Sequence, residues 1–344
     1  MLAPWAEQEG KRAIYHVMSH VIDRQFVLGP EEKETFVRMM RQYEAFCGVK
    51  VLTYCVMSNH FHILVEVPPK SSFVTSHWGD EEFVARLEKM YSPAFVEEVV
   101  QEIRRIRTGE NYAWESEEQM EAAVTKVKER FSYRFNDLGE FMKALKQRFT
   151  QWFNRRNGRK GTLWEERYKS VIVESGLACR TMAAYIDLNP VRAKIVDDAN
   201  EYRWCGYAEA DAGKRVARAG LQRVMDEREA CVRGRGVPAK EALVVYRRLM
   251  IGDTFQKGLN GRRTDEEEAA VAAADLEWNE KLNCRVRYFT DGAVIGSKAF
   301  VNEAFFGMRE RFGEKRKDGA RRMRGLPKSL FSLRDLVVTP VRRL

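Results

Sequence analysis

The spacing of apolar residues near the N-terminus is the feature that most limits the fold. Residues 12–22 read RAIYHVMSHVI, where β-branched and aromatic residues in partial alternation predict a strand. A helix is expected from Pro30 to Gly48, because proline suits a first helical turn and glycine suits a helix end. Two further strands are expected within 49–67. The order strand, helix, strand, strand predicts the opening of a ferredoxin-like α+β layer with an antiparallel sheet.

The rest of the chain is expected to be mostly helical. Between about residues 72 and 140, apolar residues recur three and four apart, which predicts a helical insertion. A strand and a helix within 162–196 would complete the first domain. We therefore expect one α+β domain over 1–208. Residues 209–344 are expected to form a mainly helical accessory region, with a linker at QKGLNGRRT (256–264).

Composition limits the class of protein and its partners. The 344 residues are 44% hydrophobic and 32% charged, which is typical of a globular protein and excludes disorder or a membrane-embedded chain. No apolar run is long enough to span a bilayer, and no secretory signal is expected. The six cysteines form no C-x-x-C pair, which favours reduced thiols in a cytosol. The net charge of +9 favours a nucleic-acid partner, although solubility alone also explains it.

The third predicted strand carries two histidines in an otherwise apolar run, YCVMSNHFHILVEVP. Residues i and i+2 of a strand share a face, so His60 and His62 project side by side. Two imidazoles placed in this way can chelate one divalent metal ion, and the alternative is a hydrogen-bonded pair without a ligand. His16 and His20 also share a face, where we expect a structural or DNA-facing role. A structural role is expected for His77 as well.

A site with two histidines needs at least one more protein ligand, and the segment AAYIDLNPVRA offers one. Tyr185 and Asn189 are four residues apart, which places them on one face of the predicted helix. An amide oxygen is a suitable ligand for Mg²⁺ or Mn²⁺, and a phenol beside it would lie near any phosphate that the metal held. Without the two histidines, packing of Tyr185 on the sheet and capping by Asn189 would be the preferred explanation.

Cations alternate with aromatic residues over 146–169, which read KQRFTQWFNRRNGRKGTLWEERYK. Cations can neutralise phosphates while aromatic faces stack on unpaired bases, which suits single-stranded or hairpin DNA. Phe149, Trp152 and Phe153 also fit a helical stripe that is typical of a core, and Tyr168 is expected to pack or to stack on a base. The residues expected to contact DNA are Arg148, Arg155, Arg156, Arg159, Lys160, Trp164, Arg167 and Lys169.

Three motifs in a fixed order resemble those of a known family. YCVMSNHFHILVEVP, followed by GRKGTLWEERYKSVIVES and then YIDLNPVRA, resembles the single-tyrosine HUH transposases. The sequence is most similar to the REP-associated tyrosine transposases of the IS200-like group, over roughly residues 12–208. The resemblance implies the HUH endonuclease fold, with His60, His62 and Asn189 as metal ligands and Tyr185 as the nucleophile.

The resemblance also implies a reaction and a setting. A divalent metal, Mg²⁺ or Mn²⁺, would polarise the scissile phosphate of single-stranded, hairpin-forming repeat DNA. Tyr185 would attack the phosphorus, giving a 5′-phosphotyrosine and a free 3′-hydroxyl that can later be rejoined. The expected setting is the prokaryotic cytosol, in association with the nucleoid. A monomer or a homodimer is expected, and no membrane partner.

Two other functions use the same residues. A domesticated transposase would bind DNA on this fold without cleaving it, but it has no need for all four site residues. A metal-dependent phosphodiester hydrolase would combine the two histidines with Glu66 or Glu174 and an activated water, and it would form no covalent adduct. The basic run from Arg309 to Arg324 makes DNA contact the preferred role for the C-terminal region.

Overall fold

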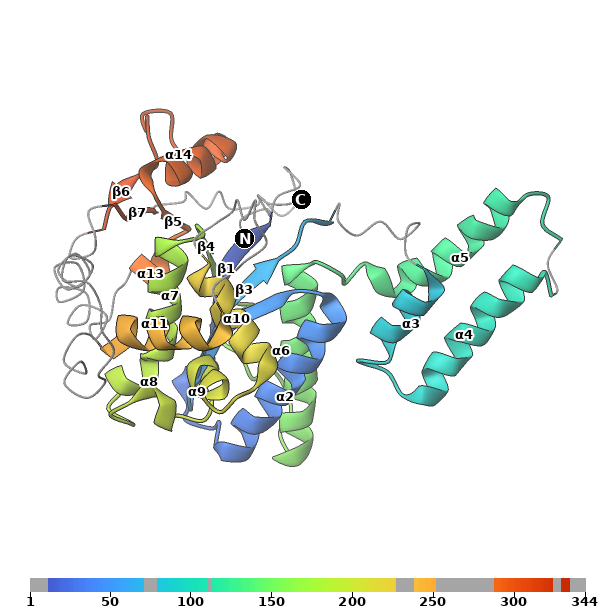
Figure 1. Ribbon diagram of the computed structural model, residues 1–344, viewed down its shortest axis with the longest axis horizontal. Coiled ribbons are helices and arrows are strands. Elements are labelled where there is room, and N and C mark those ends of the chain that lie inside the picture. Colours follow the sequence, from blue (N-terminus) through green and yellow to red (C-terminus); the bar gives the residue numbers. More distant parts are fainter. Residues whose placement is uncertain are drawn as a thin grey trace.

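Seven strands in the described part of the chain form one mostly antiparallel sheet (Figure 1). The structure, a computed structural model, describes residues 12–70, 79–110, 113–226, 238–251, 288–323 and 329–334. The strands follow the spatial order β2, β3, β1, β4, β5, β7, β6. In chain order they are β1 (Ala13–His20), β2 (Lys50–Val56), β3 (His60–Val67), β4 (Lys169–Val173), β5 (Val294–Gly296), β6 (Arg321–Arg322) and β7 (Phe331–Leu333).

The first four strands have the arrangement predicted from the sequence. β3 pairs antiparallel with β2 and with β1, and β4 pairs antiparallel with the other edge of β1. α2 (Pro30–Cys47) connects β1 to β2 and ends at Gly48, whose φ of 77° is a left-handed conformation that glycine adopts without strain. This is the split β-α-β order of a ferredoxin-like layer. The α+β fold class is therefore confirmed.

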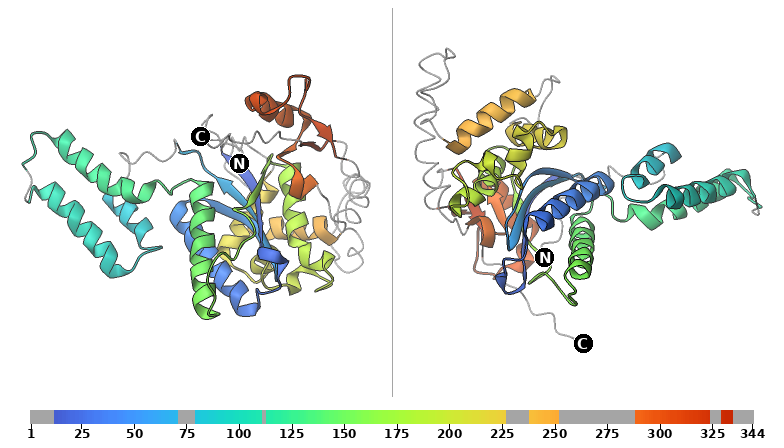
Figure 2. Two further views of the ribbon diagram at one scale, coloured as in Figure 1. Left: turned by 180° about the vertical axis from the view of Figure 1, so that it is seen from behind. Right: turned by 90° about the horizontal axis from the view of Figure 1, so that it is seen from below.

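Helices cover both faces of the sheet (Figure 2). α2 and α6 (Leu138–Arg156) pack on one face, where Phe61 of β3 is part of the core. α7 (Leu177–Asp187) and α10 (Arg215–Met225) pack on the other face. Alternate residues of a strand point to opposite faces, so His62 lies on the α7 side while Phe61 lies on the α2 side.

The predicted helical insertion forms an arm that projects from the body of the molecule (Figure 1). Its two longer helices pack against each other and bury apolar residues such as Ile103 and Phe131. Each of these two helices begins at a serine, Ser92 or Ser116, whose hydroxyl accepts a backbone N–H of the first turn. The helices of the arm are α3 (Asp80–Leu87), α4 (Pro93–Thr108) and α5 (Glu117–Ser132).

The described part of the C-terminal region is helical, as expected, but it also adds β5, β7 and β6 to the sheet. β5 pairs parallel with β4, and β7 pairs antiparallel with β5. Strands of two or three residues show no alternation in the sequence, so their pattern could not predict them. The remaining elements are η1 (Ile22–Arg24), α8 (Asn189–Arg192), η4 (Ala199–Glu201), α9 (Gly206–Asp211), α11 (Ala239–Ile251), α13 (Tyr288–Asp291), α14 (Lys298–Gly307) and η6 (Arg309–Arg311).

Two expectations lie outside the described residues. These are the role of His77 and the linker at 256–264. The domain boundary at residue 208 stays a prediction, although α10 packs closely on β2. Gly220 marks this contact, because a Cβ there would lie 2.5 Å from the carbonyl oxygen of Leu52. None of the helices in the described residues is both long and apolar enough to cross a membrane.

Candidate functional site

The four residues proposed for chemistry line one cavity of about 390 Å³. His60 and His62 reach it from β3, Tyr185 from α7 and Asn189 from α8. The sheet and the helices on its α7 side bring these distant segments together. Other side chains of the wall carry or can carry positive charge, namely His20, Arg24, Lys169 and Arg192. The cavity therefore offers nitrogen and amide donors, a phenol and several cations in one place.

The histidines of β1 lie against the histidines of β3. In the strand register His20 is opposite His60, and their rings stack with centroids 5.2 Å apart. His16 stacks on His62 with centroids 5.0 Å apart, and its Nε2 lies 2.8 Å from Nδ1 of His62. His16 and His20 share one face, as the sequence predicted. Each therefore contacts one member of the H-x-H pair.

The ring of His60 has a defined orientation. The side-chain Nδ2 of Asn59 donates to the carbonyl oxygen of Arg24 at 3.0 Å, so Oδ1 of Asn59 faces His60. Nδ1–H of His60 donates to this Oδ1 at 2.7 Å. Nε2 of His60 is then the nitrogen with a lone pair, and Asn189 Nδ2 donates to it at 3.4 Å. A ligand histidine is commonly oriented in this way through its other ring nitrogen.

Burial keeps the two inner histidines neutral. Desolvation lowers the pKa of His16 to about 4, opposed in part by the hydrogen bond to the Phe289 carbonyl. Desolvation also holds the pKa of His62 well below its usual value, and the neighbouring His16 and His60 lower it further. A neutral imidazole is the form that binds a metal, so His62 is in the form that a metal ligand requires.

Tyr185 and Asn189 do not lie on one continuous helix, which corrects the sequence expectation. α7 ends at Asp187, and α8 begins at Asn189. Pro190 is the physical reason, because it has no backbone N–H to donate to the carbonyl oxygen four residues earlier, which interrupts the helical hydrogen bonds at this junction. Both side chains still line the same cavity.

Arg192 is a charged residue of the cavity wall that contacts Tyr185 directly. Its guanidinium carbon lies 4.0 Å from the centroid of the Tyr185 ring, and Nη2 donates to the carbonyl oxygen of Tyr185 at 2.6 Å. The rings of Phe289 and His62 pack against the same phenol, with centroids at 4.6 and 6.2 Å. A cation in this place stabilises negative charge on the phenol oxygen. Arg192 is not among the site residues expected from the sequence, although it belongs to the YIDLNPVRA motif.

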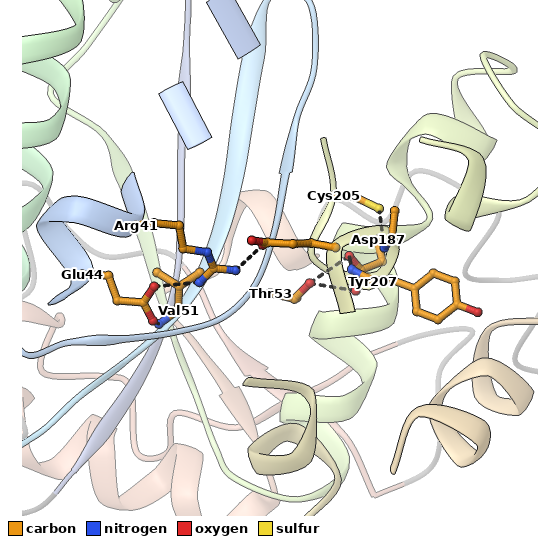
Figure 3. Close-up of polar contacts among 9 residues, drawn as sticks. Arg41, Glu44, Val51, Thr53, Asp187, Cys205 and Tyr207 are labelled. Carbon is orange, nitrogen blue, oxygen red and sulfur yellow. Dashed lines mark hydrogen bonds and ion pairs between the residues drawn. The ribbon is translucent and has the colours of Figure 1, made fainter. Parts of the chain in front are cut away.

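A buried carboxylate anchors the junction between α7 and α8 (Figure 3). Asp187 accepts hydrogen bonds from the hydroxyl of Thr53 at 2.8 Å, from the backbone N–H of Tyr207 at 3.1 Å and from the hydroxyl of Tyr246 at 2.5 Å. Burial raises the pKa of Asp187 to about 7, and these hydrogen bonds oppose the increase. The anchor ties the segment between Tyr185 and Asn189 to β2, α9 and α11.

A second polar group shown in Figure 3 joins α2 to the start of β2. Arg41 forms ion pairs with Glu44 at 2.7 Å and with Glu209. Glu44 also accepts the backbone N–H of Val51 at 2.7 Å. These contacts fix the edge of the sheet that carries Thr53, and they lie away from the cavity wall.

Most of the predicted DNA-contacting cations are exposed, and Lys169 lines the cavity itself. Arg156 forms an ion pair with Glu31 at the surface. The expectation that Trp164 contacts DNA is wrong, because Trp164 is only 6% exposed and packs against Phe36 in the core. It is a core residue here. The exposed cations are Arg148, Arg155, Arg156, Lys160, Arg167 and Lys169, and Arg159 is half-buried.

The acidic residues that a hydrolase would need have other partners. Glu66 accepts from Arg223 at 2.6 Å, and Glu174 accepts from the hydroxyl of Ser297 at 2.9 Å. Neither carboxylate lines the cavity. Within the described ranges, no group of three or more His, Cys, Asp or Glu side chains could hold a metal ion. A metal in this cavity would therefore need an amide oxygen beside the two imidazoles, which fits Asn189.

Comparisons with known proteins agree with the motifs of the N-terminal part. A family model described as "Transposase IS200 like" matches residues 10–117, which include both histidines and end before Tyr185. No curated protein matches the chain. One similar solved structure is described as the REP associates tyrosine transposase bound to a REP hairpin. It is 12% identical over 58% of this chain and 80% of that chain, with a TM-score of 0.33. The resemblance to IS200-like transposases predicted from the motifs is thus confirmed over residues 10–117.

Proposed function

We propose that this protein is a DNA transposase that cleaves and rejoins single-stranded, hairpin-forming DNA through a 5′-phosphotyrosine intermediate. The observation that carries the proposal is the shared cavity of His60, His62, Tyr185 and Asn189. These residues come from β3 and, far along the chain, from the adjacent helices α7 and α8. A protein that only binds DNA has no need to bring these four groups together.

The donor set of the cavity fits a divalent metal ion. The ligands would be Nε2 of His60, Nε2 of His62 and the amide oxygen of Asn189, with Mg²⁺ or Mn²⁺ as the ion. When bound, the ion supplies Lewis-acid polarisation of a DNA phosphate. Asn59 orients the ring of His60 so that its lone pair is on Nε2.

Tyr185 is the proposed nucleophile. Its phenol oxygen forms a bond to the phosphorus, loses its proton, and breaks the bond between phosphorus and the 3′-oxygen of the preceding nucleotide. That oxygen takes up a proton and leaves as a free 3′-hydroxyl. The guanidinium of Arg192, next to the Tyr185 ring, stabilises the negative charge on the attacking oxygen. The reverse reaction with a DNA 3′-hydroxyl rejoins the strand.

Cations around the cavity would hold the DNA backbone. Arg24 and Lys169 line the wall itself. Arg155 and Lys160 lie on the exposed surface at the end of α6 and just beyond it, where they can contact phosphates on either side of the scissile position. We infer that the single strand enters the cavity from this basic surface.

The test is a covalent trapping experiment with labelled single-stranded hairpin DNA and Mn²⁺. The wild-type protein is expected to form an adduct that survives SDS, and Tyr185→Phe is expected to form none. Tyr168→Phe is the control, because Tyr168 is half-buried and burial raises its pKa to about 12. Cleavage without an adduct would favour a hydrolase, and binding without cleavage would favour a domesticated DNA-binding protein. An adduct that survives Tyr185→Phe would mean that another residue is the nucleophile.

A further inference from the structure

His16 lies directly behind the cavity and has no task in the reaction proposed above. It is fully buried at 0% exposure on β1. Both of its ring nitrogens have partners. Nδ1 lies 3.0 Å from the carbonyl oxygen of Phe289, and Nε2 lies 2.8 Å from Nδ1 of His62. A buried polar side chain with two defined partners, one of them in the site, points to a function beyond packing.

The three groups form a chain of hydrogen bonds with only one arrangement of protons. A carbonyl oxygen can only accept, so Nδ1 of His16 carries the proton that is donated to Phe289. Nε2 of the neutral His16 ring then has a lone pair and accepts from Nδ1–H of His62. His62 is left with its lone pair on Nε2, which is the nitrogen available to a ligand in the cavity.

We propose that His16 is a positioning residue that fixes the tautomer and the ring orientation of His62. The proposal rests on the proposed function in one respect, that His62 binds a metal ion. The carbonyl oxygen of Phe289 determines which nitrogen of His16 donates and which accepts. It thereby determines the direction of the hydrogen bond between His16 and His62. His60 is oriented in the same sense by Asn59. Both metal-binding histidines thus present Nε2, through two unrelated partners.

Phe289, in the C-terminal region, contacts both His16 and Tyr185. Phe289 belongs to α13 and is 0% exposed. Its carbonyl oxygen contacts His16, while its ring packs on Tyr185 with centroids 4.6 Å apart. One residue of the C-terminal region therefore contacts the support of a metal ligand and the nucleophile at the same time.

Three substitutions separate the contribution of each nitrogen of His16. His16→Leu removes both hydrogen bonds of His16, to Phe289 and to His62. His16→Asn places an amide near the position of Nδ1 and can donate to Phe289, but it does not reach His62. His16→Gln places an amide oxygen near the position of Nε2 and can accept from Nδ1–H of His62. Tyr15→Phe is the control, because Tyr15 is the neighbouring residue of β1 and points to the opposite face.

Two measurements on the full-length protein are needed besides adduct formation. The first is the tautomer of His62, read from long-range ¹H–¹⁵N NMR spectra of metal-free protein. The second is the affinity for Mn²⁺ alone, measured by electron paramagnetic resonance. We expect the wild type and His16→Gln to carry the His62 proton on Nδ1. His16→Leu and His16→Asn should lose this preference and bind Mn²⁺ about 10- to 100-fold more weakly.

The outcomes distinguish this inference from the proposed function. If His62 of the wild type carries its proton on Nε2, or if His16→Asn binds Mn²⁺ as tightly as the wild type, the positioning role is wrong. If the wild type forms no adduct, but the His62 tautomer and the Mn²⁺ affinities are as expected, only the transposase function is contradicted. Thermal unfolding of each variant identifies any that fails to fold, and Tyr15→Phe should match the wild type in tautomer and affinity.

Discussion

Arg192 lies against the phenol that we propose as the nucleophile. Its guanidinium lies over the Tyr185 ring and also donates a hydrogen bond to the backbone carbonyl oxygen of Tyr185. These two contacts fix the position of the guanidinium. Tyr185 is only 4% exposed, and the low polarity of its surroundings strengthens the effect of the neighbouring charge.

At the residue scale, Arg192→Gln is expected to slow adduct formation about 100-fold or more, because one charge that stabilises the attacking oxygen is lost. The rate is measured with saturating hairpin DNA in single-turnover reactions. Arg167→Gln is the control, since it removes the same charge from an exposed position outside the cavity wall. Equal effects of the two substitutions would show that only the total charge matters.

The elements around the cavity are held by a few buried polar groups in addition to apolar packing. Asp187 fixes the junction of α7 and α8 to β2, as described above. Lys146 does the same for α6, which packs on the opposite face of the sheet. Its ammonium donates to the hydroxyl of Ser19 on β1 at 2.8 Å and to the carbonyl oxygens of Glu166 and Arg167 ahead of β4. It therefore links α6 to β1 and to the segment that leads into β4.

The Lys146 contact makes stability depend on pH. Burial lowers the pKa of Lys146 from its usual 10.5 to about 8. Between these values the unfolded chain binds more protons at this position than the folded chain, so this contribution to the free energy of unfolding increases with pH from about 8 to 10.5. Lys146→Met should lose that increase. Urea unfolding of both proteins at several pH values tests this, and identical pH profiles would contradict it.

At the scale of the whole molecule, the excess of positive charge is expected to appear in the salt dependence of DNA binding. Each phosphate contact to a single strand contributes about 0.7 to the slope of log affinity against log salt concentration. The double substitution Arg155→Gln with Lys160→Gln should therefore reduce this slope by about 1.4. Lys126→Gln with Arg130→Gln, on the projecting arm, changes the net charge equally and should leave the slope unchanged. Titrations with fluorescent hairpin DNA at several salt concentrations measure both.

The sequence predicted the layer that carries the histidines, because its strands alternate clearly and α2 begins and ends at distinctive residues. It also predicted that Tyr185 and Asn189 face one site, although for the wrong reason, since Pro190 ends α7 before Asn189. Trp164 could not be assigned correctly, because an aromatic residue between cations fits a core and a DNA surface equally well. Phe289 acts through its backbone carbonyl, and a carbonyl leaves no trace in a sequence pattern.

The position of Phe289 after Tyr185 in the sequence has a consequence for biosynthesis. β1, β3 and α7 are all translated before α13. A nascent chain that has not reached α13 contains His60, His62 and Tyr185 but lacks the carbonyl group that His16 contacts. Under the function proposed above, the order of synthesis would thus delay the support of His62 until α13 has been made.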